Sequence, residues 1–425
     1  MLQSIIAAFK LPDLRRRILF VFGMFAVFVI GLHIPVPGID REKMAELFQQ
    51  GGLLGMVDVF SGGALKKYTI LAMGIAPYIT ASIIMQLLTV AVPSLEAMAK
   101  EGEHGRKKIA QYTRYLTVVL AAFQAAGMNS MLQRSGILQA SPWHFTQIVV
   151  TLTAGTAFLM WMGEQIQDKG IGNGVSLMIF VGIVASLPPQ IMSTIQMIQG
   201  GAYPIPKVVA LIVLFIGTIV GIVAVQQAQR KIPIQHVKRV VGNKVYGGAT
   251  SYMPLRVNSA GVIPIIFAIS IQMFPATIAQ FAGSGKFGET VRYIAHLFSP
   301  GASIWAAIVY AALIIFFTYF YTAVQFNVPE VAENMKKYGS FIPGIRPGKP
   351  TLEYLDRVMT RITLGGAIFL CIIALLQYWA PQLTGIQTFY LVGGTSLLIV
   401  VGVALETMQA IEAQLLMRHY EGFIK

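Results

Sequence analysis

Long stretches without charge are the feature that most restricts what this chain of 425 residues can fold into. Nine intervals contain no Asp, Glu, Lys or Arg. Each is long enough for a helix of about 20 residues to cross a hydrocarbon core about 30 Å thick. Only 12% of the residues are charged and 55% are hydrophobic, against about a quarter charged in soluble proteins. A soluble multidomain enzyme is therefore excluded, and the continuous apolar runs disfavour a membrane β-barrel.

These intervals predict an all-α integral membrane protein with ten transmembrane helices. The longest interval, 362–405, contains Pro381 and Gly385 and is interpreted as two helices joined by a tight external turn. The ten expected helices cover roughly residues 18–33, 68–92, 115–133, 145–163, 174–194, 208–229, 257–278, 302–326, 362–380 and 386–405.

The start of the chain resembles a secretory signal peptide, because three arginines, Arg15 to Arg17, precede the first apolar run. The run leads into Pro35–Gly38 without a small-residue cleavage pattern. We therefore expect a retained first transmembrane helix, preceded by an interfacial helix at residues 3–14.

The distribution of basic residues predicts the orientation. With the N-terminus in the cytoplasm, 24 of the 32 Lys and Arg residues fall in cytoplasmic segments and 8 in external segments. Positive charge is enriched on the cytoplasmic side of membrane proteins. Both termini are therefore predicted to be cytoplasmic.

An internal repeat suggests how the helices are grouped. The pattern G-x-x-P-x-I occurs at Gly74–Ile79 and again at Gly261–Ile266. Each copy lies near the start of the second helix in a group of five. Because five is odd, the second group is expected to cross the membrane in the opposite sense. Inverted repeats with interrupted helices are typical of transporters and channels. We expect a weakened, kinked helix at each proline, with a static kink or a chance match as the alternatives.

The expected domain organisation follows from this repeat. It comprises a cytoplasmic interfacial segment at 1–17, a first five-helix half at 18–200 that includes the external segment 53–66, a second half at 201–405 with cytoplasmic loops 230–256 and 327–361, and a cytoplasmic tail at 406–425.

The predicted helices lack the side chains that several functions need. No Asp, Glu or His lies near the centre of a predicted span, which disfavours a proton- or sodium-coupled transporter. No H-E-x-x-H motif or nucleophile pattern indicates an intramembrane protease. The single cysteine, Cys371, excludes a disulfide framework, and Gly170–Gly174 lacks the lysine of a phosphate-binding loop. The remaining possibility is a conduit with an apolar lining, which can exclude water and ions by dewetting.

Many short motifs in order then indicate a family. The chain resembles the SecY family, the large subunits of protein-conducting channels, over nearly its whole length. The resemblance rests on Pro35–Gly38, Phe60–Leu65, Met73–Leu88, Lys100–Arg114, Gly163–Gln165, Gly170–Ser176, Asn258–Pro264, Phe341–Gly348, Met359–Arg361 and Gly393–Val400.

The resemblance implies two inverted five-helix halves arranged as a clamshell around a central pore, with a short external plug helix. It implies a translocase subunit of the bacterial plasma (inner) membrane. Such a subunit passes unfolded secretory polypeptides across the membrane and releases transmembrane segments sideways into lipid. It implies no catalytic residue, no metal and no cofactor. The implied partners are the small subunits SecE and SecG, the motor ATPase SecA, the ribosome and its RNA, unfolded preproteins with their signal sequences, and membrane lipid.

The resemblance also assigns residues. The implied pore ring consists of Ile79, Ile83, Ile179, Ile183, Ile266 and Ile399. The implied plug contains Leu54, Val57, Phe60, Ser61, Gly62 and Gly63, and the implied lateral gate contains Thr89, Gln124 and Asn258.

Two basic cytoplasmic loops are expected to contact cytosolic partners. Each carries six Lys or Arg residues, which suit RNA phosphates or an acidic protein surface. The residues assigned to this role are Arg239, Lys244, Arg346, Lys349 and Arg357. The sequence reads Asn243-Lys244 where members of this family often have two arginines, so the tip of the first loop departs from the pattern.

Two other functions stay open at this stage. An inverted-repeat transporter of small solutes or lipids would need a buried polar site. A structural membrane scaffold for ribosomes would explain the basic loops but not the plug-like segment.

Overall fold

The fold is described from a computed structural model of the chain. The structure describes residues 2–40, 43–44, 58, 61–201, 203–236, 239–241, 244–246, 250–281, 286–298, 303–385 and 394–421.

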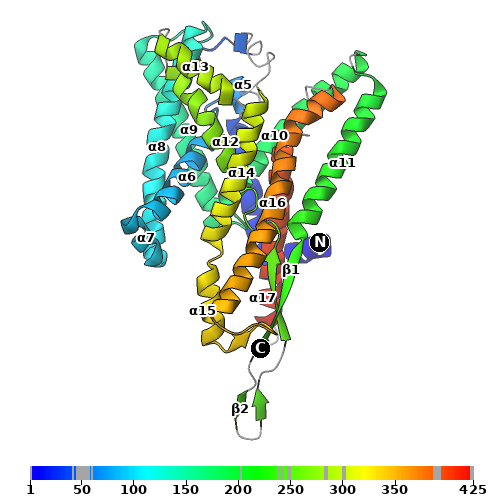
Figure 1. Ribbon diagram of the computed structural model, residues 1–425. Coiled ribbons are helices and arrows are strands. Elements are labelled where there is room, and N and C mark those ends of the chain that lie inside the picture. Colours follow the sequence, from blue (N-terminus) through cyan, green and yellow to red (C-terminus); the bar gives the residue numbers. More distant parts are fainter. Residues whose placement is uncertain are drawn as a thin grey trace.

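The architecture is a bundle of long helices, and each of the ten expected spans overlaps one of them (Figure 1). Residues 386–393 of the last expected span lie outside the described residues. These helices are α2 (Pro12–Gly31), α6 (Ala76–Ala91), α8 (Glu103–Arg134), α9 (Pro142–Lys169), α10 (Gly174–Gln199), α11 (Ile205–Gln227), α12 (Ile263–Phe281), α14 (Ile304–Gln325), α16 (Lys349–Thr384) and α17 (Gly394–Glu421). Shorter helices are α1 (Leu2–Lys10), α5 (Ala64–Lys67), α7 (Pro93–Lys100), α13 (Lys286–Phe298) and α15 (Val328–Lys337).

Length and hydropathy support a polytopic membrane protein. Within the described residues, seven helices are long and apolar enough to cross a membrane alone. An eighth span is added if α6 and α7, which meet at a 98° bend, count as one. The α12 helix is apolar over a shorter stretch, Ile263–Pro275. The α2 helix contains three arginines in its first two turns, which shortens its uncharged part.

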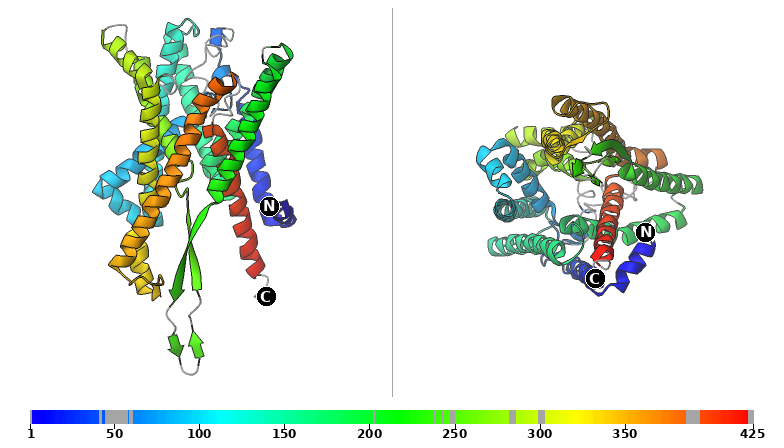
Figure 2. Two further views of the ribbon diagram at one scale, coloured as in Figure 1. Left: turned by 45° about the vertical axis from the view of Figure 1, so that its right-hand side comes forward. Right: turned by 90° about the horizontal axis from the view of Figure 1, so that it is seen from below.

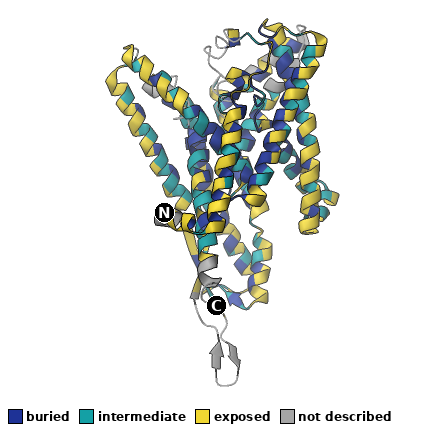
Figure 3. Ribbon diagram, turned by 180° about the vertical axis from the view of Figure 1, so that it is seen from behind, coloured by how far each residue is buried: buried dark blue, intermediate teal, exposed yellow. Residues whose placement is uncertain are grey.

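Burial separates central from peripheral helices. Half of the apolar window of α17 is buried inside the protein, against 17% of that of α11. Exposed residues accordingly cover most of α11, the long helix at the left of Figure 3. Since these exposed faces are apolar, they suit lipid rather than water. Both chain ends lie toward the end of the bundle from which the strands project (Figure 2).

The prolines of the repeated motif do not break helices, so the expected kinks are wrong. Pro77 lies in the first turn of α6, and Pro264 is the second residue of α12. Proline is tolerated there because the first N–H groups of a helix have no intrahelical partner. The motif glycines, Gly74 and Gly261, have φ values of 57° and 63°. The motif therefore forms a turn with a left-handed glycine that leads into a helix, in both halves.

The first basic loop is largely β-structure, which the sequence analysis did not predict. Strands β1 (Gln229–His236) and β4 (Thr250–Arg256) pair antiparallel, as do β2 (Arg239–Val241) and β3 (Lys244–Tyr246). They form a long hairpin that projects beyond the helices (Figure 1). Strand β5 (Ser340–Phe341) pairs with β1 and so connects the two basic loops. A separate apolar cluster, which includes Ile232 and Leu355, supports this region.

Glycines allow some backbones to approach closely. A Cβ atom on Gly155 of α9 would lie 2.0 Å from the carbonyl oxygen of Ile70, and one on Gly394 of α17 would lie 2.1 Å from that of Ile373. No side chain fits at such distances. Small residues at helix contacts are typical of membrane proteins, where close packing stabilises the bundle.

Candidate functional site

The six isoleucines assigned to the ring lie in or against one hydrophobic cluster. Four helices contribute them, namely α6, α10, α12 and α17. Ile83, Ile179, Ile183 and Ile399 are buried, with at most 4% of their surface exposed. Ile79 and Ile266 are partly buried and pack against the same cluster. Residues separated by up to 320 positions in the sequence therefore lie in or against the same hydrophobic cluster.

The spacing of four of these residues places them in two pairs, each on one face of a helix. Ile79 and Ile83 are four residues apart on α6, and Ile179 and Ile183 are four residues apart on α10, so each pair occupies one face of its helix. β-Branched side chains have few rotamers in a helix, which keeps their contact surface defined. A buried cluster of this kind excludes water without offering a polar ligand site.

The end of the predicted plug contacts the same region. Gly62 lies against Gly182 of α10, between Ile179 and Ile183 in the sequence. A Cβ atom on Gly62 would lie 3.1 Å from the carbonyl oxygen of Gly182. Ser61 is 4% exposed and packs against Gly74, at the turn before α6. We call Ser61, Gly62 and Gly63 the plug joint. Leu54, Val57 and Phe60 lie outside the described residues.

A carboxylate that the sequence analysis overlooked holds the plug joint. Asp58 Oδ1 accepts a hydrogen bond from the Lys66 amide at 2.8 Å and is 3.4 Å from Ser61 Oγ. Ser61 Oγ also accepts one from the Leu65 amide at 3.3 Å. Burial raises the pKa of Asp58, against the opposing effects of the Lys66 amide and ammonium. A lone acid in an apolar and glycine-rich external segment is the signal that could have revealed it.

The three residues assigned to the lateral gate lie on adjacent elements. Helix α8, which carries Gln124, packs against both α6 and α12. Thr89 on α6 donates to the Met85 carbonyl of its own helix at 2.7 Å. Asn258 Nδ2 donates to the Gly261 carbonyl just before α12 at 3.0 Å, while its buried Oδ1 has no partner among the described residues. The gate role of these residues stays a prediction.

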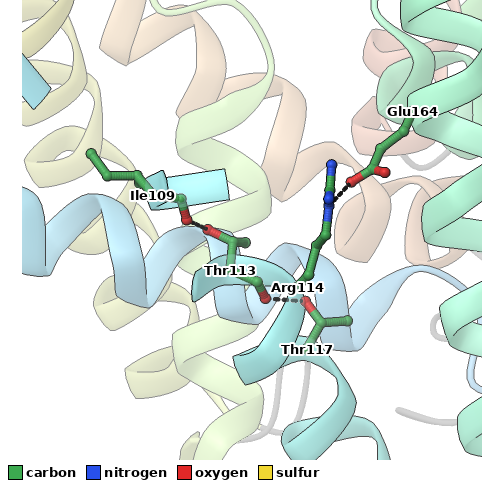
Figure 4. A network of polar contacts seen from close by, with 5 residues as sticks. All are labelled: Ile109, Thr113, Arg114, Thr117 and Glu164. Atoms are coloured by element: carbon green, nitrogen blue, oxygen red, sulfur yellow. Dashed lines mark hydrogen bonds and ion pairs between the residues drawn. The ribbon is translucent and has the colours of Figure 1, made fainter. Parts of the chain in front are cut away.

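An ion pair joins α8 to α9 (Figure 4). Arg114 Nε lies 2.6 Å from Glu164 Oε1, with 48% and 30% of the two side chains exposed. Thr113 and Thr117, on either side of Arg114, bond only the backbone of α8, at 2.9 Å to Ile109 and 2.7 Å to Thr113. Both residues lie next to the predicted spans 115–133 and 145–163, inside helices that continue past those spans.

Comparison with known proteins identifies the family. The SecY family model matches residues 69–408. Protein translocase subunit SecY of Streptomyces scabiei is 46% identical, with both chains covered completely. Protein translocase subunit SecY of Thermotoga maritima is also 46% identical, over 100% of this chain and 98% of its own. The chain belongs to the SecY family.

Solved structures agree on the fold. A structure described as a protein conducting channel matches with a TM-score of 0.65 at 18% identity, over 94% of this chain and 92% of its own. A second, in which the plug domain of SecY is said to stabilise the closed state and maintain a membrane seal, matches with a TM-score of 0.64, also at 18% identity, over 96% of each chain. The SecY-family fold therefore extends over most of the chain.

The residues assigned to cytosolic contacts cluster on this SecY-family chain's projecting end. Arg346, Lys349 and Arg357 are exposed, and the Arg346 carbonyl accepts a 2.9 Å hydrogen bond from Thr351. Arg239 pairs with Tyr246 across the β2–β3 hairpin, and Lys244 pairs with Val241. Of the side chains on this hairpin nothing is described, so their role stays a prediction. In the described part of the chain, no group of three or more His, Cys, Asp or Glu residues could hold a metal.

Proposed function

We propose that this chain is the channel-forming subunit of a protein translocase and passes unfolded secretory polypeptides across the membrane. The observation that supports the proposal is the placement of six isoleucines from four helices in or against one apolar cluster, in a chain that matches translocase subunits over its full length. A small-solute transporter is not favoured, because the family membership covers the whole chain and the cluster is apolar.

The isoleucine ring would act as a deformable seal. Dispersion contacts are individually about 0.1–0.2 kcal/mol per atom pair and have no preferred direction. A passenger of any sequence can therefore replace isoleucine–isoleucine contacts with its own, at little cost. When no passenger is present, the same side chains pack together and exclude ions. The plug joint, seated against Gly182, would hold the plug beside the ring.

The junction between α6, α8 and α12 would serve as the lateral gate. These helices lie in contact, and the two proposed halves, 18–200 and 201–405, would open there as a clamshell. An apolar segment of the passenger is more stable in lipid than in an aqueous pore. Hydrogen bonds between helices in membranes contribute about 0.6 kcal/mol on average, so Thr89, Gln124 and Asn258 would hold the gate only weakly.

Energy for movement would come from partners. The proposed partners are the SecA ATPase or the translating ribosome at Arg239, Lys244, Arg346, Lys349 and Arg357, with SecE and SecG as small membrane subunits. The structure of Sec61 in a ribosome–channel complex, which matches with a TM-score of 0.61, supports the ribosome as one partner. The proposed location is the bacterial plasma membrane, with both termini in the cytoplasm, as the 24 to 8 distribution of basic residues indicates.

Site-specific photocrosslinking to a stalled secretory chain tests the proposal. A photoreactive residue at Ile83, in the ring, is expected to form adducts with the passenger. The matched control is Val213 on α11, which is 65% exposed on the peripheral surface and is expected to form none. Adducts at neither position, in a folded complex with its partners, would overturn a polypeptide conduit; equal adducts at both would refute a passage at the ring.

A further inference from the structure

The side chain of His236 connects strands from the two basic loops. It is the last residue of β1, and its ring contacts one serine on each neighbouring strand. The Nδ1 atom lies 2.8 Å from Ser340 Oγ on β5, and the Nε2 atom lies 3.3 Å from Ser251 Oγ on β4. A serine hydroxyl can both donate and accept a hydrogen bond, so both contacts can form whichever ring nitrogen carries the proton.

The strand register explains why the imidazole lies there. Ile232, Ile234 and His236 are two residues apart along β1, so they lie on one face of the strand. Ile232 is buried, and Ile234 packs against the same apolar cluster. His236 lies directly opposite Ser340 in the pairing of β1 with β5, and such cross-strand neighbours lie close together. The apolar face of β1 therefore ends in a polar contact.

The pairing of β5 with β1 is short, so a single side-chain contact contributes much of its stability. The pairing joins Gln235 to Phe341 and His236 to Ser340. Ser340 is 7% exposed. A hydroxyl in such a position destabilises the folded state if it loses its hydrogen-bond partner. His236 therefore stabilises the position of β5 against β1.

The segment after β5 connects this position to Arg346. Ile342 is 2% exposed and belongs to the apolar cluster that supports the hairpin. The Ile345 amide donates to the Ile342 carbonyl at 3.0 Å, and the Arg346 carbonyl accepts from Thr351 at 2.9 Å. The backbone is thus held at short intervals between β5 and α16, and the position of Arg346 depends on where β5 lies.

We propose that His236 is a positioning residue that fixes the loop containing Arg346 against the hairpin, so that both basic loops present one rigid surface to ribosomal RNA. Exposed basic residues lie on both elements, namely Arg230, Lys231, Arg346 and Lys349. A nucleic-acid backbone presents closely spaced phosphates, which suit basic residues on two adjacent elements. Loops that are already fixed need less ordering on binding. The proposal rests on the proposed cytosolic contact, but the positioning can be measured without a partner.

Hydrogen exchange on full-length protein in nanodiscs measures the positioning. His236→Ala removes the partner of the buried Ser340 hydroxyl, so exchange at the amides of residues 340–346 is expected to rise about five-fold or more. Gln235→Ala is the matched control. Gln235 also lies opposite β5, but successive side chains of a strand point to opposite faces, so this variant should leave the exchange unchanged.

Further variants distinguish the hydrogen bond from a loss of packing. His236→Ala/Ser340→Ala should exchange more slowly than His236→Ala alone, because it also removes the polar group that lost its partner. A loss of packing alone would make the double variant exchange faster. His236→Gln keeps a donor and an acceptor and should restore most of the protection. Ser251→Ala should have a small effect, since its contact is longer and exposed.

Binding of non-translating ribosomes to the same nanodiscs measures the consequence. His236→Ala is expected to weaken binding about three-fold or more, because the loop must then be ordered on binding. The double variant and His236→Gln should recover affinity in step with their protection, and Gln235→Ala should bind normally. Arg346→Gln should lose affinity without any change in exchange at β5.

Three outcomes would overturn the proposal. Equal exchange in His236→Ala and Gln235→Ala would refute the positioning role. Faster exchange in His236→Ala with unchanged ribosome affinity, while Arg346→Gln weakens binding, would refute a single rigid surface. Weaker binding of the motor ATPase but not of ribosomes would replace RNA with an acidic protein surface. If the unmodified protein binds no ribosomes, the proposed ribosome contact fails, and the exchange measurements still decide the positioning role.

Discussion

The contact between the plug joint and α10 makes a specific prediction about two neighbouring glycines. Gly62 and Gly63 have similar positive φ values, 72° and 81°, so alanine is strained at either position by roughly 1–2 kcal/mol. Only at Gly62 would an added Cβ atom also contact a neighbouring residue. Its Cβ atom would lie 3.1 Å from the carbonyl oxygen of Gly182, whereas a Cβ atom on Gly63 has nothing within 4 Å.

The difference between Gly62→Ala and Gly63→Ala therefore isolates the contact. The nearest atoms at Gly62 belong to backbone, which cannot rotate away, and overpacking of this kind costs about 1–3 kcal/mol. We expect the joint to open roughly 5- to 150-fold more often in Gly62→Ala than in Gly63→Ala, since 1.4 kcal/mol corresponds to a factor of ten.

Hydrogen exchange measures the opening of the plug joint directly. The amides of Leu65 and Lys66 donate to Ser61 Oγ and Asp58 Oδ1, so they exchange when the joint opens. Faster exchange at these amides in Gly62→Ala than in Gly63→Ala is the expected result. Equal exchange in the two variants would refute the contact with Gly182 as a determinant of the seated joint.

Three further predictions concern the ring, the carboxylate and the ion pair. Ile83→Asn should raise ion leak through reconstituted protein, because a polar side chain hydrates the seal; Val213→Asn on the peripheral face should not. Acidification should stabilise the plug joint, since burial raises the pKa of Asp58: the stabilisation is present below the ordinary carboxyl pKa and is lost as the pH rises through the pKa in the folded protein. Exchange at the joint should therefore slow as the pH falls, after correction for intrinsic rates, and Asp58→Asn should abolish this dependence. A double-mutant cycle on Arg114→Gln and Glu164→Gln should give a coupling of about 0.2–1 kcal/mol in thermal unfolding, because both side chains are partly exposed.

Each of these has a result that contradicts it. Leak that is unchanged in Ile83→Asn would remove that residue from the seal. A pH dependence that survives in Asp58→Asn would assign the effect to another group. A coupling of zero between Arg114 and Glu164 would make their contact incidental to the packing of α8 on α9.

Local patterns predicted the elements well but not their boundaries. Every predicted span corresponds to a helix, because hydropathy over 20 residues reflects what a bilayer can accept. The predicted and observed helix boundaries differ where a helix leaves the lipid and enters water. Outside the membrane a helix such as α8 continues through charged residues, and the hydropathy pattern no longer marks its end.

The β-hairpin was missed although a signal for it was present. Ile232 and Ile234 alternate with other residues, and Gly242-Asn243 is a dipeptide typical of two-residue hairpin turns. The G-x-x-P motif was also misread. Proline indicates an interruption both when it kinks a helix and when it lies in the first turn of one. Only the backbone shows that α6 begins just before Pro77.

The sequence by itself determined the class of the protein and the approximate position of its apolar helices. These properties depend on the transfer of each segment between water and lipid, which is a local property of composition. The tertiary structure decided which isoleucines share the central hydrophobic cluster, that Gly62 lies against Gly182, and that Asp58 holds the plug joint. Such contacts depend on close packing between residues far apart in the chain, and the hydrophobicity of each residue contains no information about its neighbours in space.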